Sequence, residues 1–221
     1  GLPARPSEIE YVACALPDWE GAFNTSLRFK NWSFSMQWDG KVGGMTYSQS
    51  HHKMCEQGHL AETLNGRKPG TSLYLDIADP DVLKLFEKQK ITPVAGVYCI
   101  APGVVDNGDG TYSPNQKLVT LESYYKEYYR IGNVETNTFS TTYLKLREVR
   151  LDYQLPKSWL KNTFINNASV GIYGRNLLCI TSYPMYDPET TSLDGNTFVP
   201  GVEVGTLPTS RSWGVNLKVD F

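Results

Sequence analysis

Two histidines and a cysteine share a spacing that suits metal binding. His51, Cys55 and His59 follow one another at four-residue intervals, and on a helix such residues share one face. Imidazole nitrogens and a thiolate are ligands that Zn²⁺ prefers in proteins. No fourth ligand is evident, however, so a solvated loop helix is favoured. We therefore predict no metal site and no cofactor.

A group of tyrosines offers a second kind of chemistry. Tyrosine rings stack on the apolar faces of sugars and fill ligand pockets. Tyr124 and Tyr128 belong to a cluster that also contains Tyr125 and Tyr129, and the same aromatic type recurs in a later loop. Packing against neighbouring loops or a partner protein is the favoured alternative. The candidate substrate-binding residues are Tyr124, Tyr128, Tyr183 and Tyr186.

Hydrolytic chemistry finds little support. The histidines cluster within nine residues, and no serine in a nucleophile motif accompanies them. Carboxylates such as Glu148 and Asp152 alternate along one apparent strand and do not resemble a glycosidase pair. The segment 106–110 lacks the ligand spacing of a calcium loop and is read as a turn. We predict no catalytic residues and no enzyme.

Composition excludes several classes of protein. The 221 residues include 21 Lys+Arg and 23 Asp+Glu, and this balance removes the electrostatic argument for a nucleic-acid binder. With 40% hydrophobic and 20% charged residues, the chain is too apolar to be disordered. No apolar run is long enough for a transmembrane helix, and no signal peptide is visible. The four cysteines allow three disulfide pairings, but free thiols are favoured.

The elements that must position these residues are β-strands. Apolar and polar residues alternate with the period of two that marks a half-buried strand. A tight turn at Lys30-Asn31 joins the first two strands into a hairpin. The predicted strands span residues 22–30, 32–47, 140–155, 167–181 and 209–221.

Two long connections separate the strands. The first, 48–139, contains helix-like pieces at 49–64, 81–90 and 121–130, whereas 182–208 has a loop composition. Loops of this length are uncommon in compact domains and usually carry function. The connections at 30–31 and 156–166 are short, so short and long connections alternate.

Such strands suit a membrane barrel or a soluble sandwich. Charges in series on the polar face, aromatic residues near strand ends and alternating connection lengths favour the barrel. Five strands leave two open edges, which lipid does not tolerate, so the chain should be part of a larger protein. The aromatic residues assigned to the membrane interfaces are Trp32, Tyr47, Tyr143, Tyr153, Tyr183, Trp213 and Phe221. The predicted lipid-facing residues are Phe34, Met36, Trp38, Val149, Leu151, Val170, Ile172, Val215, Leu217 and Val219.

Several motifs, in order along the chain, resemble one family. The segments that carry the resemblance are Leu16–Thr25, Phe29–Phe34, Asp39–Gly44, Tyr143–Pro156, Gly174–Leu178, Tyr186–Glu189, Gly201–Pro208 and Arg211–Phe221. With these segments the chain is similar to the C-terminal barrel segment of SusC/RagA family TonB-dependent outer-membrane transporters of Bacteroidetes. The middle of the chain, 50–120, matches the family least.

The resemblance implies an all-β fold, with about five strands of a 22-stranded transmembrane barrel and long extracellular loops containing short helices. The plug domain would lie outside this chain, and 48–139 and 182–208 would be extracellular. It further implies import of oligosaccharides, or of peptides, with a SusD-like surface lipoprotein as partner and the TonB complex engaging a missing N-terminal part. The alternative is a soluble carbohydrate-binding β-sandwich.

The last predicted strand is also the expected assembly signal. Its alternating residues would lie in outer-membrane lipid and be recognised by the barrel-assembly machinery, as the resemblance implies. An edge strand exposes unpaired backbone groups that can serve as a pairing template. The residues of this signal are Trp213, Val215, Leu217, Val219 and Phe221.

Overall fold

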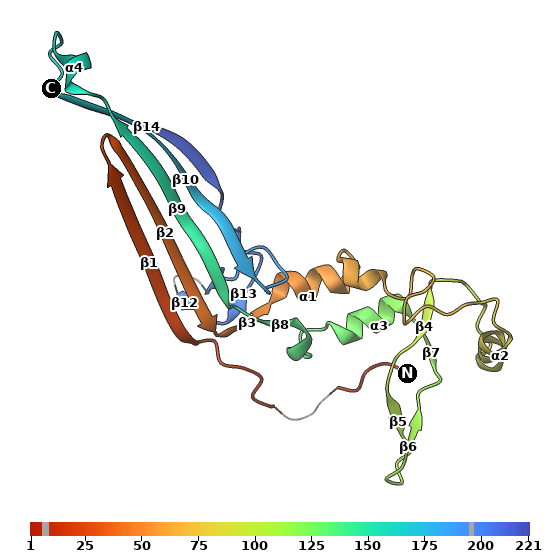
Figure 1. The fold of residues 1–221 in the computed structure, drawn as a ribbon. Helices are drawn as coiled ribbons and strands as arrows, with labels where there is room; N and C mark the ends of the chain where they lie inside the picture. Colours follow the sequence, from red (N-terminus) through yellow and green to blue (C-terminus); the bar gives the residue numbers. More distant parts are fainter. Residues whose placement is uncertain (6–8, 195–196) are drawn as a thin grey trace. The chain divides into compact units, whose positions relative to one another are not determined.

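The computed structural model describes residues 1–5, 9–194 and 197–221. The chain divides into two compact units (Figure 1). The helical unit comprises residues 1–12 and 47–138, and the sheet unit comprises 13–46 and 139–221. No helix among the described residues is both long and apolar enough to cross a membrane.

One antiparallel sheet of five long strands forms the body of the sheet unit (Figure 1). The strands lie in the order β1-β2-β9-β10-β14, which is also their order along the chain. Each strand overlaps one of the five segments predicted from alternation, although the first begins at Pro17 and not at residue 22. Their bounds are β1 Pro17–Phe29, β2 Trp32–Gly43, β9 Tyr143–Gln154, β10 Asn167–Thr181 and β14 Ser212–Asp220.

The second strand is shorter than predicted. Gly43 and Gly44 have φ angles of 81° and 76°, a left-handed conformation that side-chain-bearing residues rarely adopt. A Cβ atom on Gly43 would lie 2.2 Å from Oδ2 of Asp18. The predicted strand 32–47 is therefore wrong at its end, because two glycines interrupt it. A short strand follows as β3, Met45–Ser48, in a small sheet with β8, Thr138–Ser140, and β13, Val202–Glu203.

The short connections gather at one end of the sheet. Lys30, with a φ of 52°, and Asn31 turn the chain tightly, so that Phe29 and Trp32 are direct partners. The side-chain amide of Asn31 donates to the Gln154 carbonyl oxygen over 2.9 Å. Helix α4, Lys157–Leu160, and the end of β14 lie at this same end (Figure 1). The long connections leave from the opposite end.

The remaining elements of the sheet unit are short. Strands β11, Ser192–Asp194, and β12, Thr197–Val199, form a hairpin within the connection between β10 and β14. This connection was predicted as a loop from its composition.

Short helices and hairpins make up the helical unit. Helix α1, Gln49–Glu56, begins where the Ser48 hydroxyl accepts from the His51 amide, and Asp79 caps α2 in the same way. The predicted helix 49–64 is interrupted after Glu56, and a separate 3₁₀ turn follows. The bounds are η1 Ala61–Leu64, α2 Pro80–Gln89, β4 Tyr98–Ile100, β5 Val104–Asp106, β6 Tyr112–Pro114, β7 Leu118–Thr120, α3 Leu121–Tyr128 and η2 Glu135–Asn137.

These helices bury a core of their own. Tyr125 and Tyr129 of the α3 region stack with ring centroids 6.1 Å apart, and Phe86 of α2 packs edge-to-face on Tyr98. Helices this short are marginal in isolation and depend on such packing. The buried cluster consists of Cys55, Leu73, Cys99, Ala101, Leu121, Tyr124, Tyr125 and Tyr129.

Candidate functional site

The strand register separates apolar from polar side chains across the whole sheet. Residues directly opposite one another on antiparallel strands project to the same face. One such row runs through Leu27, Phe34, Leu151, Ile172 and Val215, one residue from each strand. Every member of this row is apolar.

The neighbouring row has the opposite character. It runs through Arg28, Ser33, Asp152, Gly171 and Asn216, again with one residue from each strand. Arg150 donates to Asp152 over 2.6 Å on the same face. The sheet therefore has an apolar face and a polar face that remain distinct across all five strands.

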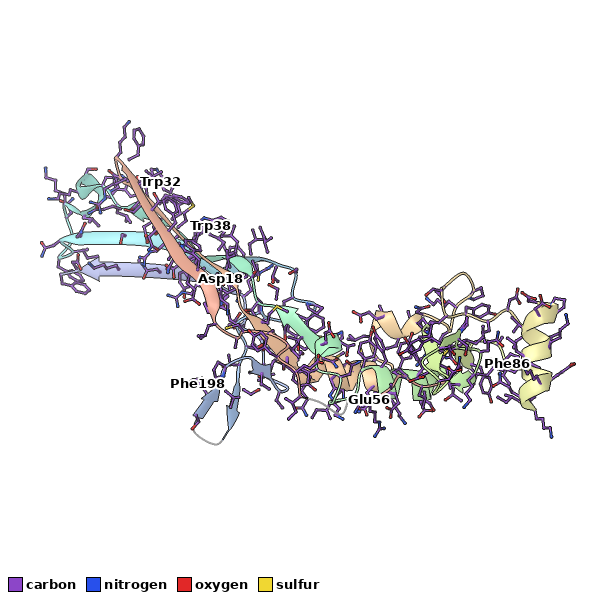
Figure 2. All side chains as sticks on the ribbon, turned by 90° about the horizontal axis from the view of Figure 1, so that it is seen from below. Asp18, Trp32, Trp38, Glu56, Phe86 and Phe198 are labelled. Carbon is purple, nitrogen blue, oxygen red and sulfur yellow. The ribbon has the colours of Figure 1, made fainter. Side chains whose placement is uncertain are left out.

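The apolar face carries large side chains that little else in the sheet unit covers. Val215 is 72% exposed and Leu217 70% exposed, and Trp32 and Trp38 lie along β2 (Figure 2). All ten residues predicted to face lipid share this face. The apolar face consists of Phe23, Leu27, Phe29, Trp32, Phe34, Met36, Trp38, Leu144, Leu146, Val149, Leu151, Tyr153, Ala168, Val170, Ile172, Leu178, Ile180, Trp213, Val215, Leu217 and Val219.

A bulge in β9 changes which residues reach the polar face. The pairing with β2 skips Arg147, since Gln37 opposes Glu148 whereas Trp38 opposes Leu146. An extra residue of this kind re-aims side chains next to functional sites. Because of the bulge, the side chains of Arg147 and Glu148 both lie on the polar face, and Leu146 stays on the apolar face.

Beside this bulge lies a group of paired charges, here called the charge network. It consists of Asp39, Lys145, Arg147, Asp187 and Glu189. The Lys145 ammonium lies 2.6 Å from Asp187 and also contacts Glu189, and the Lys145 and Asp187 side chains are each 4% exposed. Both carboxylates belong to the connection that follows β10. The network therefore ties this connection to β9.

Arginine completes the charge network. Arg147 donates to both carboxylate oxygens of Asp39 over 2.6 and 2.7 Å, and it also contacts Glu189. Tyr143 hydroxyl lies 2.8 Å from a Glu189 oxygen. Burial opposes ionisation of Asp187, but hydrogen bonds from Lys145 and Thr209 leave its pKa below the ordinary value. Burial also raises the pKa of Glu189, but hydrogen bonds from Arg147 and Lys145 outweigh it, so this pKa too is lowered.

A cavity of about 290 Å³ adjoins the network in the sheet unit. Tyr186 lines it and is 64% exposed, whereas Tyr183 is 5% exposed and packs on Phe139. Of these two predicted substrate-binding residues, only Tyr186 presents a ring to an open space. The lining residues are Lys145, Asn176, Leu178, Cys179, Tyr186, Asp187, Thr209 and Arg211.

The other two candidate tyrosines line an open hollow of about 520 Å³ in the helical unit, here called the tyrosine hollow. Tyr124 and Tyr128 stack with centroids 5.5 Å apart. Tyr124 is buried, and burial raises the pKa of its hydroxyl to about 12, whereas Tyr128 is 36% exposed. Tyr128 is thus the more accessible ring. The lining residues are Ala61, Glu62, Leu64, Asn65, Thr71, Leu73, Tyr124, Tyr125, Tyr128 and Tyr129.

The sequence spacing of histidine and cysteine is realised only in part. His51 and Cys55 lie on one face of α1 as the spacing predicted, but His59 is exposed beyond the end of the helix. The third group beside them is Glu62 of η1. Burial raises the pKa of the Cys55 thiol to about 12. All four cysteines have free thiols in the structure.

Some aromatic residues predicted at membrane interfaces have other surroundings. The Tyr143 hydroxyl donates to Asp39 of the charge network, Tyr183 is buried, and the Tyr47 hydroxyl lies 2.8 Å from His52 Nδ1. These three side chains are engaged in contacts within the chain, and their location at a membrane interface stays a prediction. Phe221, at the end of the proposed assembly signal, stacks on Phe164 with centroids 5.5 Å apart.

Sequence reasoning missed the charge network and Glu62. The network joins residues more than forty positions apart, and nothing in local periodicity connects them. One signal was available for the bulge: Leu144 and Leu146 are even-numbered, whereas the apolar residues from Val149 onward are odd-numbered. That change of phase indicates an extra residue in the strand.

Comparison with known proteins gives consistent similarities. The TonB-dependent receptor P3 of Formosa agariphila is 23% identical over 212 residues, which cover 93% of this chain and 16% of that receptor. The RagAB peptide importer matches in its open-open state, with a TM-score of 0.53, and in its closed-closed state, with a TM-score of 0.54. In both comparisons the sequence identity is 17% and the match covers 94% of this chain. It covers 17% of the solved chain in the open-open state and 18% in the closed-closed state. No protein-family model matches.

These similarities agree with the motifs. The chain spans 16% of the curated relative's length, and the solved structures show the same fold over nearly all of this chain. The names of these relatives describe a TonB-dependent receptor and a peptide importer. Over nearly its whole length the chain is thus similar to a segment of a TonB-dependent receptor, and it has the fold of part of the RagAB importer, in agreement with the motifs.

Proposed function

We propose that this chain is a sector of an outer-membrane transporter that imports nutrients in a TonB-dependent manner. The separation of the two faces across five strands carries the proposal. An apolar face suits lipid, and a polar face with charges suits a wet barrel interior. The strands contain 9 to 15 residues, and about 9–11 residues are needed to cross the hydrocarbon core of a bilayer.

The edges of the sheet support its place in a larger barrel. Within the described residues, β1 and β14 each pair on one side only. Unpaired backbone groups are costly in lipid, so strands from the rest of the receptor would close the sheet. We propose about 22 strands in all, as in the family that the motifs resemble. In this arrangement the short turns lie in the periplasm.

The long connections then lie outside the cell. The connection 48–139 and the connection 182–208 both begin at the end of the sheet opposite the short turns. We propose that they contact the imported molecule and a SusD-like lipoprotein. The tyrosine hollow, with Tyr128 accessible, supports a ligand that offers flat apolar faces, such as an oligosaccharide. The similarity to the RagAB peptide importer supports peptides as the alternative cargo.

A soluble carbohydrate-binding β-sandwich is disfavoured by the uncovered apolar face. A sandwich buries one face of each sheet against a second sheet. In the described part of the sheet unit, no second layer covers Val215, Ile172 or Leu217, which are 72%, 59% and 70% exposed.

Uptake by intact cells tests the proposal. Cells with and without the gene for the whole receptor are supplied with labelled oligosaccharides and, separately, labelled oligopeptides. We expect cells without the receptor gene to lose uptake of one class, and a strain without TonB to lose uptake of the same class. Unchanged uptake of both classes would contradict the proposal. Replacing residues 47–138 by a short linker should abolish co-purification of the lipoprotein and leave membrane assembly intact.

A further inference from the structure

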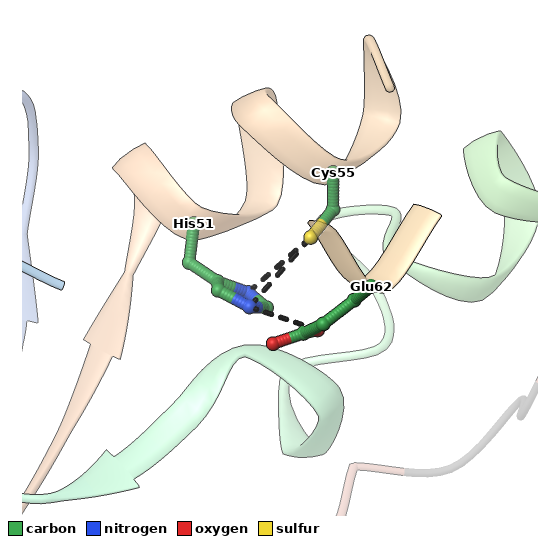
Figure 3. Close-up of side chains that lie close together, drawn as sticks. All are labelled: His51, Cys55 and Glu62. Carbon is green, nitrogen blue, oxygen red and sulfur yellow. Dashed lines mark hydrogen bonds and ion pairs between the residues drawn. The ribbon is translucent and has the colours of Figure 1, made fainter. Parts of the chain in front are cut away.

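Three side chains of the helical unit converge on one point. His51 and Cys55 project from α1, and Glu62 reaches them from η1 (Figure 3). His51 Nε2 lies 3.6 Å from Cys55 Sγ and 3.4 Å from Glu62 Oε2. Tyr129 donates its hydroxyl hydrogen to the same Glu62 oxygen over 3.0 Å.

The two separations from His51 Nε2 have the lengths expected for edges of a tetrahedral zinc site, and all the ligand atoms lie within 4.8 Å of one another. Typical bond lengths to Zn²⁺ are about 2.0 Å for nitrogen and oxygen and about 2.3 Å for sulfur. With tetrahedral angles, they place nitrogen and sulfur about 3.5 Å apart, and nitrogen and oxygen about 3.3 Å apart. The two separations from His51 Nε2 agree with these values within 0.1 Å, as 3.6 and 3.4 Å. Cys55 Sγ also lies 3.9 Å from Nδ1, beside the ring, so the sulfur must move toward the Nε2 lone pair when a metal binds.

A fourth residue orients the imidazole. Asn137 is fully buried and donates its side-chain amide to the Tyr129 carbonyl oxygen over 3.0 Å. Its Oδ1 therefore faces His51 Nδ1, 3.0 Å away, and accepts a hydrogen bond from that nitrogen. In a neutral imidazole this leaves Nε2 as the nitrogen with the lone pair. A hydrogen bond from the other ring nitrogen is the usual support of a metal-binding histidine.

We propose that His51 Nε2, Cys55 Sγ and the Glu62 carboxylate bind one Zn²⁺ ion. Histidine, cysteinate and glutamate suit zinc, and three protein ligands leave the fourth position for water or a ligand oxygen. The Glu62 side chain is 52% exposed and lines the tyrosine hollow, so the ion can enter from that side. The ion fixes α1 to η1 and thereby the wall of the hollow.

Zinc titration of the intact, detergent-purified protein tests the site. After removal of metal with a chelator, calorimetry should show about one Zn²⁺ bound per chain. Glu62→Gln keeps the shape of an exposed side chain and should weaken binding at least 10-fold, whereas Cys55→Ala should abolish it. The matched controls are His59→Ala, beside the helix, and Cys99→Ala, a second buried cysteine. Both controls should bind like the wild type.

Two further readouts separate coordination from general effects on folding. Binding should release about one proton at pH 7, because the thiol loses its hydrogen when sulfur coordinates the metal. Cobalt substitution should produce a thiolate-to-cobalt charge-transfer band that Glu62→Gln retains at saturation and Cys55→Ala lacks. Binding of less than about 0.2 zinc ions per wild-type chain, which is far below one full site, would overturn the proposal. So would equal affinity of wild type and Glu62→Gln.

Discussion

Replacing Lys145 with Met should release the connection between β10 and β14 from the sheet. The Lys145 ammonium lies 2.6 Å from Asp187 and also contacts Glu189. Methionine fills a similar volume but leaves Asp187 as a buried carboxylate without its cation. Thr209 still donates to it, through its amide over 3.2 Å and its hydroxyl over 2.5 Å.

The structure sets the size of the effect. Removing one partner of a buried ion pair costs about 3–5 kcal/mol, because the other charge stays buried and unpaired. Since Glu189 keeps Arg147, the lower part of this range applies. A cost of about 3 kcal/mol corresponds to an increase of roughly 100-fold in the population of the open connection.

Hydrogen exchange of single amides measures this opening. The amides of Glu189 and Thr209 both donate to Asp187, over 3.0 and 3.2 Å, and therefore report directly on the anchor. Lys218→Met is the matched control, because this lysine is exposed and lies 3.8 Å from Asp220. Exposed pairs of this kind contribute about 0–1 kcal/mol, so the control should exchange like the wild type.

The effect should depend on pH in a defined direction. Because the pKa of Asp187 is lowered in the folded wild type, its stabilisation is present above the unfolded carboxyl pKa and is lost as pH falls through the folded pKa. In Lys145→Met, burial raises that pKa, so the deficit should be largest at neutral pH and shrink on acidification. Protection of the Glu189 and Thr209 amides within twofold of wild type at pH 7 would refute the reasoning.

Two other changes test the tyrosine hollow and the last strand. Tyr124→Ala should destabilise the helical unit by about 3–5 kcal/mol in thermal unfolding, since it empties a buried aromatic site, whereas Tyr128→Ala should leave stability nearly unchanged and weaken ligand binding in calorimetry. Equal stability losses would show that the two rings are not distinguished by burial. Phe221→Asp should lower the folded fraction in outer-membrane extracts, measured by heat-modifiable migration, because it places a charge at the end of the apolar face and breaks the stack on Phe164. Equal folded fractions would remove this strand from the assembly signal.

The strands were predictable because each carries its own evidence. Alternation along residues such as Phe34, Met36 and Trp38 depends on neighbours two positions apart, and the register then follows from the tight turn at Lys30-Asn31. The break at Gly43 was not predicted, although paired glycines allowed it, because glycine only permits a left-handed conformation and does not require it.

The sites were predictable only where one element supplied them. The four-residue spacing placed His51 and Cys55 on one helical face, but Glu62 comes from a separate turn that the tertiary fold brings alongside. Lys145 and Asp187 likewise meet only after β9, β10 and the following connection are in place. Interactions of this kind depend on global packing and leave no periodic signal in the sequence.

A pair of neighbouring arginine substitutions tests most directly whether the apolar face contacts lipid. Leu217 lies on the apolar face opposite Val170, and Asn216 lies on the polar face opposite Gly171, near Asp152. The free energy of unfolding of the intact receptor from a lipid bilayer should fall by about 2–4 kcal/mol in Leu217→Arg, as for a cation placed at the bilayer midplane. Asn216→Arg should lose less than about 1 kcal/mol, because the polar face is wet and carries the Asp152 carboxylate. Equal losses, or a larger loss for Asn216→Arg, would contradict the assignment of the apolar face to lipid.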